Sequence, residues 1–91
     1  MSVQQTIRLK LERGLDPLRL EIVDESHLHV GHSEAPSDGE SHFHIEIVSI
    51  VFQGKGRAER HRLVYKILAS EISQSVHALS LRLLSPEEET N

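Results

Sequence analysis

Three short stretches of the chain place apolar residues at every second position, which is typical of β-strands with one buried face. The apolar positions are Leu18, Leu20 and Ile22 in the first stretch, Phe43, Ile45 and Ile47 in the second, and Leu79, Leu81 and Leu83 in the third. Polar residues such as Arg19, Glu21, His44 and Glu46 fill the alternate positions of the first two stretches. We therefore predict strands that direct one face toward a common core.

Apolar residues at helical spacing occur before the first of these strands and between the second and the third. Val3, Ile7 and Leu11 recur after Ser2, a good N-cap residue, and Gly14 supplies a stop before Pro17. A second helix is predicted over about 57–73. Its apolar stripe consists of Leu63, Val64, Ile67, Leu68 and Ile72.

The order helix, strand, strand, helix, strand predicts an α+β fold, with a three-stranded sheet and helices packed on one face. We expect a single domain over residues 1–91, with an ordered core at about 3–85 and a frayed acidic tail at 86–91. Residues 31–39 are rich in Gly, Ser, Pro and Asp, and they predict a loop too long for a tight hairpin turn.

Length and composition argue against an enzyme. A chain of 91 residues buries only about 60 to 65% of its unfolded surface, which leaves little room for a deep catalytic pocket. The sequence has no cysteine, so a disulfide, a thiol nucleophile and an all-protein thiolate metal site are excluded. It also lacks a glycine-rich phosphate motif and a His-Glu-x-x-His motif. We expect a protein that binds rather than catalyses.

Neither a membrane span nor a targeting segment is evident. No apolar run approaches the roughly 18 to 20 residues of a transmembrane helix, and the first five residues do not resemble a signal peptide. We expect a cytoplasmic, bacterial-like protein that does not enter membranes.

The net charge of −4 conceals a separation of charge along the sequence. Residues 24–46 hold six acids and no Lys or Arg, whereas residues 55–66 hold five bases and one acid.

Seven histidines form the main chemical signal, since neutral imidazole is a common ligand of transition metals. His77 lies between the second helix and the third strand, and its residue context alone favours a half-buried ring bonded to a carbonyl. His27, His29 and His32 fall near the long loop, where histidines are usually solvated. His42 and His44 are predicted to face solvent from the outer face of a strand, and His61, between two arginines, fits an anion-facing surface.

Four sequence blocks resemble the BolA family in order and spacing. They are Asp24-Glu25-Ser26, Glu40-Ser41-His42-Phe43, Arg60-His61-Arg62-Leu63-Val64-Tyr65 and Val76-His77-Ala78-Leu79-Ser80-Leu81. The resemblance spans nearly the whole chain up to Pro86 and implies an αββαβ fold similar to a class II KH domain. Many relatives continue into a Trp-bearing C-terminal segment that this chain lacks, so we do not expect a terminal helix.

The same resemblance implies a role as an iron–sulfur adaptor. BolA-like proteins pair with a monothiol glutaredoxin around a [2Fe-2S] cluster, and the partner's cysteine and a glutathione thiolate supply the sulfur ligands. The resemblance implies that His77 is one ligand; His29 and His32 are nearly equal candidates for the second, and His27 ranks third. We expect no cluster in the isolated protein. Basic residues at 55–66 are expected to pair with glutathione carboxylates or with acidic groups of the partner.

A DNA-binding regulator of the stress response and cell morphology is the alternative, because such transcriptional roles are attributed to bacterial BolA-like proteins. The residues predicted to meet a partner or nucleic-acid phosphates are Lys55, Arg57, Arg60, His61, Arg62 and Lys66. Two features weaken this hypothesis: Gly54 and Gly56 enclose one residue rather than the two of a KH Gly-x-x-Gly loop, and the net charge is negative. A charged helix face that only confers solubility would also explain the cluster. We rank the adaptor role first.

Overall fold

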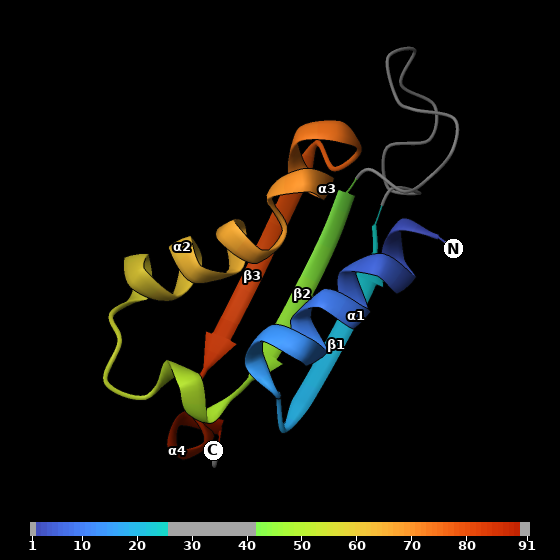
Figure 1. Cartoon of the computed structure of the whole chain (residues 1–91). Helices are drawn as coiled ribbons and strands as arrows, with labels where there is room; N and C mark the ends of the chain where they lie inside the picture. Colours follow the sequence, from blue (N-terminus) through green and yellow to red (C-terminus); the bar gives the residue numbers. More distant parts are fainter. Residues whose placement is uncertain (1, 26–41, 90–91) are drawn as a thin grey trace.

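The computed structural model describes residues 2–25 and 42–89 and shows an α+β fold with three strands, as predicted (Figure 1). In chain order the elements are α1 (Val3–Leu15), β1 (Arg19–Asp24), β2 (His42–Val48), the 3-10 turn η2 (Ile50–Phe52), α2 (Arg57–Ile67), α3 (Ala69–Gln74), β3 (Ala78–Leu84) and α4 (Pro86–Glu89). None of the helices in these ranges is long and apolar enough to cross a membrane.

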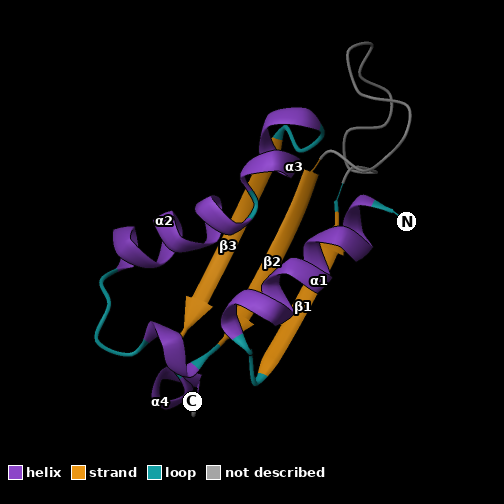
Figure 2. Ribbon diagram, viewed as in Figure 1, coloured by secondary structure: helices purple, strands orange, loops and turns teal. Residues whose placement is uncertain are grey.

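The sheet has the order β1-β2-β3, and β2 pairs antiparallel with β1 but parallel with β3. Helices α1 and α2 lie on the same face of the sheet (Figure 2). In the parallel pair, His42 lies opposite Ala78 and Val48 lies opposite Leu84. The first residues of β2 and β3 therefore meet at one end of the sheet.

The core lies between this face and the helices. Phe43, Ile45 and Ile47 of β2 are fully buried, which confirms the predicted alternation in the central strand. The buried residues that meet them from the helices include Ile7, Leu11, Leu15, Val64 and Leu68. Leu18 departs from the prediction, because it precedes β1 and is 64% exposed.

Helix α1 begins as predicted but ends later. Ser2 forms a capping box with Gln5. Gly14 does not end the helix, which continues to Leu15 because that side chain is buried in the core. The chain turns at Asp16 (φ 44°), whose N–H donates to the carbonyl of Glu12. Gly14 instead permits close packing, since a Cβ there would lie 2.9 Å from Cδ1 of Ile67.

The second predicted helix is divided into α2 and α3. Leu68 leaves helical geometry (φ −100°, ψ 19°), yet its side chain is 1% exposed and remains in the core. Its N–H donates to Val64, and its carbonyl accepts from Ile72, so hydrogen bonding continues across the break. The division lets the chain change direction over the sheet while the apolar stripe stays inward (Figure 1).

The acidic C-terminal segment is folded where we predicted a frayed tail and no terminal helix. Residues 86–89 form the single turn α4, whose Glu88 carboxylate accepts from the N–H of Ser85 at 2.8 Å. Glu88 also bonds Arg60, and Glu89 bonds Arg19. These partners lie 28 and 70 residues away in sequence, so local composition did not reveal them.

Candidate functional site

His77 lies at the end of the sheet where β2 and β3 begin. It directly precedes Ala78, the first residue of β3, and its side chain is exposed. Its ring nitrogens have no hydrogen-bond partner in residues 2–25 and 42–89. The half-buried, carbonyl-bonded ring favoured by residue context is therefore wrong. Strand pairing fixes the backbone next to this imidazole and leaves the ring available.

The segment 26–41 connects β1 to β2 at the same end of the sheet as His77. The N–H of Glu25 donates to the carbonyl of His42 at 2.8 Å, and His42 lies opposite Ala78 in the sheet. His27, His29 and His32 fall within this segment and lie outside the described residues. The structure therefore places both ends of the segment at the same end of the sheet as His77, with His42 in the strand next to β3 and Glu25 beyond it, on the β1 side.

A shallow hollow of about 170 Å³ adjoins His77 between α2, α3 and the start of β3. The other residues that line it are Tyr65, Ile72, Val76, Ala78 and Leu79. Val76 is buried, and its N–H donates to the carbonyl of Glu71 at 2.8 Å. The turn that carries His77 is thus anchored on both sides, by the end of α3 and by the pairing of β3. Across the described ranges, no three His, Asp or Glu side chains gather into a metal site.

The two strand histidines lie on the sheet face opposite the core, as predicted, but neither ring is fully solvated. His44 Nδ1 lies 3.0 Å from Ser80 Oγ. His42 Nε2 lies 3.9 Å from Glu25 Oε1. Both rings therefore contact side chains of the same sheet end or face, and we assign them no ligand role.

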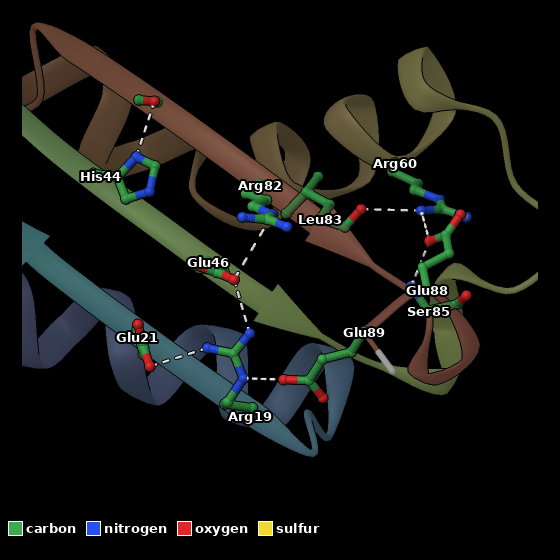
Figure 3. A network of polar contacts seen from close by, with 11 residues as sticks. Arg19, Glu21, His44, Glu46, Arg60, Arg82, Leu83, Ser85, Glu88 and Glu89 are labelled. Atoms are coloured by element: carbon green, nitrogen blue, oxygen red, sulfur yellow. Dashed lines mark hydrogen bonds and ion pairs between the residues drawn. The ribbon is translucent and has the colours of Figure 1, made fainter. Parts of the chain in front are cut away.

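An ion-pair network crosses this outer face (Figure 3). Arg19 contacts Glu46 at 2.8 Å and Glu21 at 3.0 Å, and it bonds Glu89 of α4. The hydrogen bond from Arg19 lowers the pKa of Glu46, and the bonds to Glu46 and Glu89 raise the pKa of Arg19. The network joins β1, β2 and α4, and the partners that join these elements are too far apart in sequence to leave a local pattern.

A basic cleft of about 490 Å³ lies at the other end of β3, beside the first turns of α2. Its charged or titratable lining residues are Lys55, Arg57, Arg60, His61, Arg82 and Glu88. Lys55 and Arg57 make no ion pair with any described residue. His61 Nδ1 lies 2.9 Å from the carbonyl of Arg57, which can only accept, so Nδ1 carries the proton and Nε2 remains available.

Arg60 differs from the other cations of the cleft because it is held within the fold. Its side chain is 12% exposed and donates to the carbonyls of Lys55 and Leu83, each at 2.9 Å. It also donates to Glu88 at 2.7 Å and lies 5.8 Å from the ring centre of Phe52. The bond from Arg60, aided by the N–H of Ser85, lowers the pKa of Glu88 to about 2. The basic run at 55–66 predicts a partner surface for Arg60, whereas the structure gives this residue contacts within the fold.

The structure does not bring all the predicted basic residues together. Arg62 and Lys66 are exposed on α2 but do not line the cleft. Six residues of extended chain separate His77 from Leu83, which corresponds to about 20 Å. Lys55 and Arg57 therefore lie toward the other end of β3 from His77. The histidine end and the basic end form two distinct candidate sites.

The family model described as BolA-like protein matches residues 11–88, which include both candidate sites. The chain belongs to the BolA-like family. The BolA-like match begins within α1 and ends within α4, and it confirms the resemblance inferred from the four sequence blocks.

Individual BolA-like relatives agree with this assignment. The chain is 48% identical over 86 residues to SufE-like protein 1, chloroplastic/mitochondrial, of Arabidopsis thaliana, covering 90% of this chain and 23% of that protein. It is 44% identical over 88 residues to the DNA-binding transcriptional regulator BolA of Haemophilus influenzae, covering 97% of this chain and 82% of that protein. The structure of BolA1 from Arabidopsis thaliana has a TM-score of 0.88 and 38% identity, covering 98% of this chain and 97% of that one.

Proposed function

We propose that this BolA-like chain is a non-enzymatic adaptor that pairs with a monothiol glutaredoxin in iron–sulfur cluster trafficking or iron regulation. The observation that carries the proposal is the imidazole of His77. It is exposed, it has no hydrogen-bond partner among the described residues, and it lies at the end of the sheet where Glu25 and His42 flank the segment 26–41. That segment contains His29 and His32, so a second imidazole would come from a stretch of chain that joins the sheet at the same end as His77. We further propose that the complex acts in the cytoplasm.

The donor set of the chain fits a shared cluster rather than one that the chain holds alone. His77 supplies one imidazole, and either His29 or His32 would supply the second. The sequence has no cysteine, so the thiolates must come from the glutaredoxin and from glutathione. When bound, a [2Fe-2S] cluster with imidazole in place of thiolate carries less negative charge and has a higher reduction potential.

The contribution of the chain itself is orientation. His77 is held between the anchored end of α3 and the first pair of β3, so its ring is presented without a large loss of backbone entropy. The adjoining hollow next to Tyr65 offers an apolar contact to the partner at the same place. A partner that approaches this end can therefore contact the imidazole and the hollow together.

The test is a titration of the protein into a cluster-loaded monothiol glutaredoxin with glutathione, followed by visible circular dichroism and size-exclusion elution. We expect a changed spectrum and a one-to-one heterodimer. His77→Ala, His29→Ala and His32→Ala are measured beside His61→Ala, which removes an imidazole from the opposite end. We expect His77→Ala and one of the two loop variants to alter the spectrum, whereas His61→Ala should not.

An unchanged spectrum with folded His77→Ala would remove this residue from the ligand set. Absence of any heterodimer with the unmodified chain would reject the adaptor role as a whole.

DNA binding is the second candidate, and the observation that favours it is the cleft with its unpaired Lys55 and Arg57. A bacterial relative bears the name DNA-binding transcriptional regulator. Neutralising variants Lys55→Gln and Arg57→Gln should each lower duplex affinity. Each should also reduce the slope of log K against the logarithm of salt concentration by about one. Fluorescence anisotropy across a salt series measures both quantities. Absence of binding at low salt would reject this candidate.

A further inference from the structure

The cations of the basic cleft differ in whether a carboxylate lies close enough to balance their charge. Arg60 faces the Glu88 carboxylate, and Arg82 Nε lies 3.8 Å from Glu46. Lys55 and Arg57 have no carboxylate partner within the described ranges. They leave the wall formed by the start of α2 with uncompensated positive charge.

The cleft already holds one oxyanion, and that oxyanion belongs to the chain. The two carboxylate oxygens of Glu88 lie 2.7 Å from Nη1 and 3.4 Å from Nη2 of Arg60, so the guanidinium meets the carboxylate with both of its terminal nitrogens (Figure 3). Glu88 is therefore an anion of the chain itself, bound to a cleft cation whose side chain is only 12% exposed. A tetrahedral oxyanion such as phosphate can bind a planar guanidinium in the same two-pronged way, and it offers additional oxygens to neighbouring donors.

Glu88 can leave this position without moving Arg60. The guanidinium remains held by the carbonyls of Lys55 and Leu83, whose bonds involve Nε and Nη1. Glu88 itself stands on the single turn α4, and its side chain is 47% exposed. The cation is thus fixed, whereas its carboxylate partner lies on a short, solvent-facing element.

We propose that the cleft between α2 and β3 binds a phosphate group, and that Glu88 competes with this phosphate for Arg60. Lys55 and Arg57 supply the uncompensated positive charge, and His61 Nε2 supplies a further donor when protonated. The cleft has about 490 Å³, which accommodates a phosphate and part of the molecule that carries it. The site shares residues with the second candidate function, but it requires neither a nucleic acid nor the adaptor role.

The test is an amide NMR titration of the full chain with sodium phosphate at pH 7, with sodium chloride adjusted to keep the ionic strength constant. The informative variant is Glu88→Gln, because the amide oxygen still accepts from Ser85 while the competing charge is lost. Glu89→Gln is the matched control. It makes the same change in the same turn, but Glu89 contacts Arg19 on the outer face.

We expect phosphate-specific shifts at residues 55–61 and 81–84. Glu88→Gln should bind phosphate roughly three- to tenfold more tightly, a modest gain because the site is partly exposed. Glu89→Gln should bind like the unmodified chain, and Lys55→Gln combined with Arg57→Gln should bind at least about fivefold more weakly. Thermal unfolding of each variant establishes that it is folded.

Shifts that sodium chloride reproduces at the same ionic strength would overturn the phosphate site. Equal phosphate affinities for Glu88→Gln and Glu89→Gln would overturn the competition. Parallel titrations with a mononucleotide and with a short DNA duplex identify the source of the phosphate. Binding of the mononucleotide without the duplex would support the phosphate site and reject the DNA-binding candidate.

Discussion

The guanidinium of Arg60 donates a 2.9 Å hydrogen bond to the backbone carbonyl of Leu83, which lies in the edge strand β3. At the other edge of the sheet, the side-chain amide of Gln4 donates to the carbonyl of Ile22 in β1 at 3.3 Å. Each edge strand therefore has a carbonyl occupied by a helix side chain. Such contacts reduce the main-chain groups that a foreign strand could use for pairing.

Replacement of Arg60 should destabilise the protein although the residue belongs to a charged helix face. Arg60→Ala removes the donors to the carbonyls of Lys55 and Leu83, and we expect a loss of about 2 to 4 kcal/mol in the free energy of unfolding. Urea denaturation measures the change. Arg62→Ala, at an exposed position of the same helix, should change stability by no more than about 0.5 kcal/mol. Similar effects of the two variants would contradict the internal role of Arg60.

The ion pair between Glu88 and Arg60 makes stability depend on acid pH. The pKa of Glu88 falls from its ordinary value of 4.5 to about 2 in the folded protein, so the folded state favours the ionised carboxylate. The resulting stabilisation is complete above the ordinary pKa and is lost as the pH falls from 4.5 toward 2. Urea denaturation over this range should show that the stability difference between the unmodified chain and Glu88→Gln shrinks with falling pH. A constant difference would contradict this assignment.

Gly14 and Ile67 should be energetically coupled. Gly14→Ala improves helix propensity, but its Cβ would lie 2.9 Å from Cδ1 of Ile67. Ile67→Val removes Cδ1, after which the nearest atom is Cγ1 at 3.5 Å, an ordinary contact. We expect Gly14→Ala to be more favourable in the Ile67→Val background by at least about 0.5 kcal/mol. A double-mutant cycle measured by chemical denaturation tests this coupling, and additivity would refute it.

His77 should be dispensable for folding. Its side chain is exposed and has no hydrogen bond with the described part of the chain, so His77→Ala should leave the free energy of unfolding within about 0.5 kcal/mol of the unmodified value. Thermal and urea denaturation provide the measurement. A larger loss would mean that effects of this variant on a cluster spectrum report on folding rather than on ligation.

The periodicity of apolar residues was sufficient to predict the strands and the core, because burial of one sheet face requires an apolar residue at every second position. The alternation at Phe43, Ile45 and Ile47 requires one buried sheet face, and the structure confirms it. The break at Leu68 could not be inferred, because this residue satisfies the helical stripe and stays buried on both interpretations. The fold of α4 depends on Arg19 and Arg60, and pairing between residues so distant in sequence leaves no local pattern.

For the candidate sites too, the local sequence predicted which residues matter, but not the arrangement that depends on contacts distant in sequence. The sequence identified His77 through its motif and the basic residues through their density, but not the distance between the two groups. That distance follows from the course of β3, which carries the chain from the histidine end to the basic end. The structural role of Arg60 was likewise hidden, since a charged residue in a basic run looks the same whether it faces solvent or a buried carbonyl.

The placement of α4 also determines how this protein can be attached to a surface or a reporter. Gln4 contacts Ile22 near the end of β1, so the N-terminal turn of α1 lies toward the histidine end, whereas α4 lies at the opposite end of the sheet (Figure 1). A dye or an immobilisation tag joined after α4 would be attached at the end of the sheet away from His77. The same group joined ahead of Ser2 would stand at the histidine end of the sheet, which is the end that the proposed partner approaches.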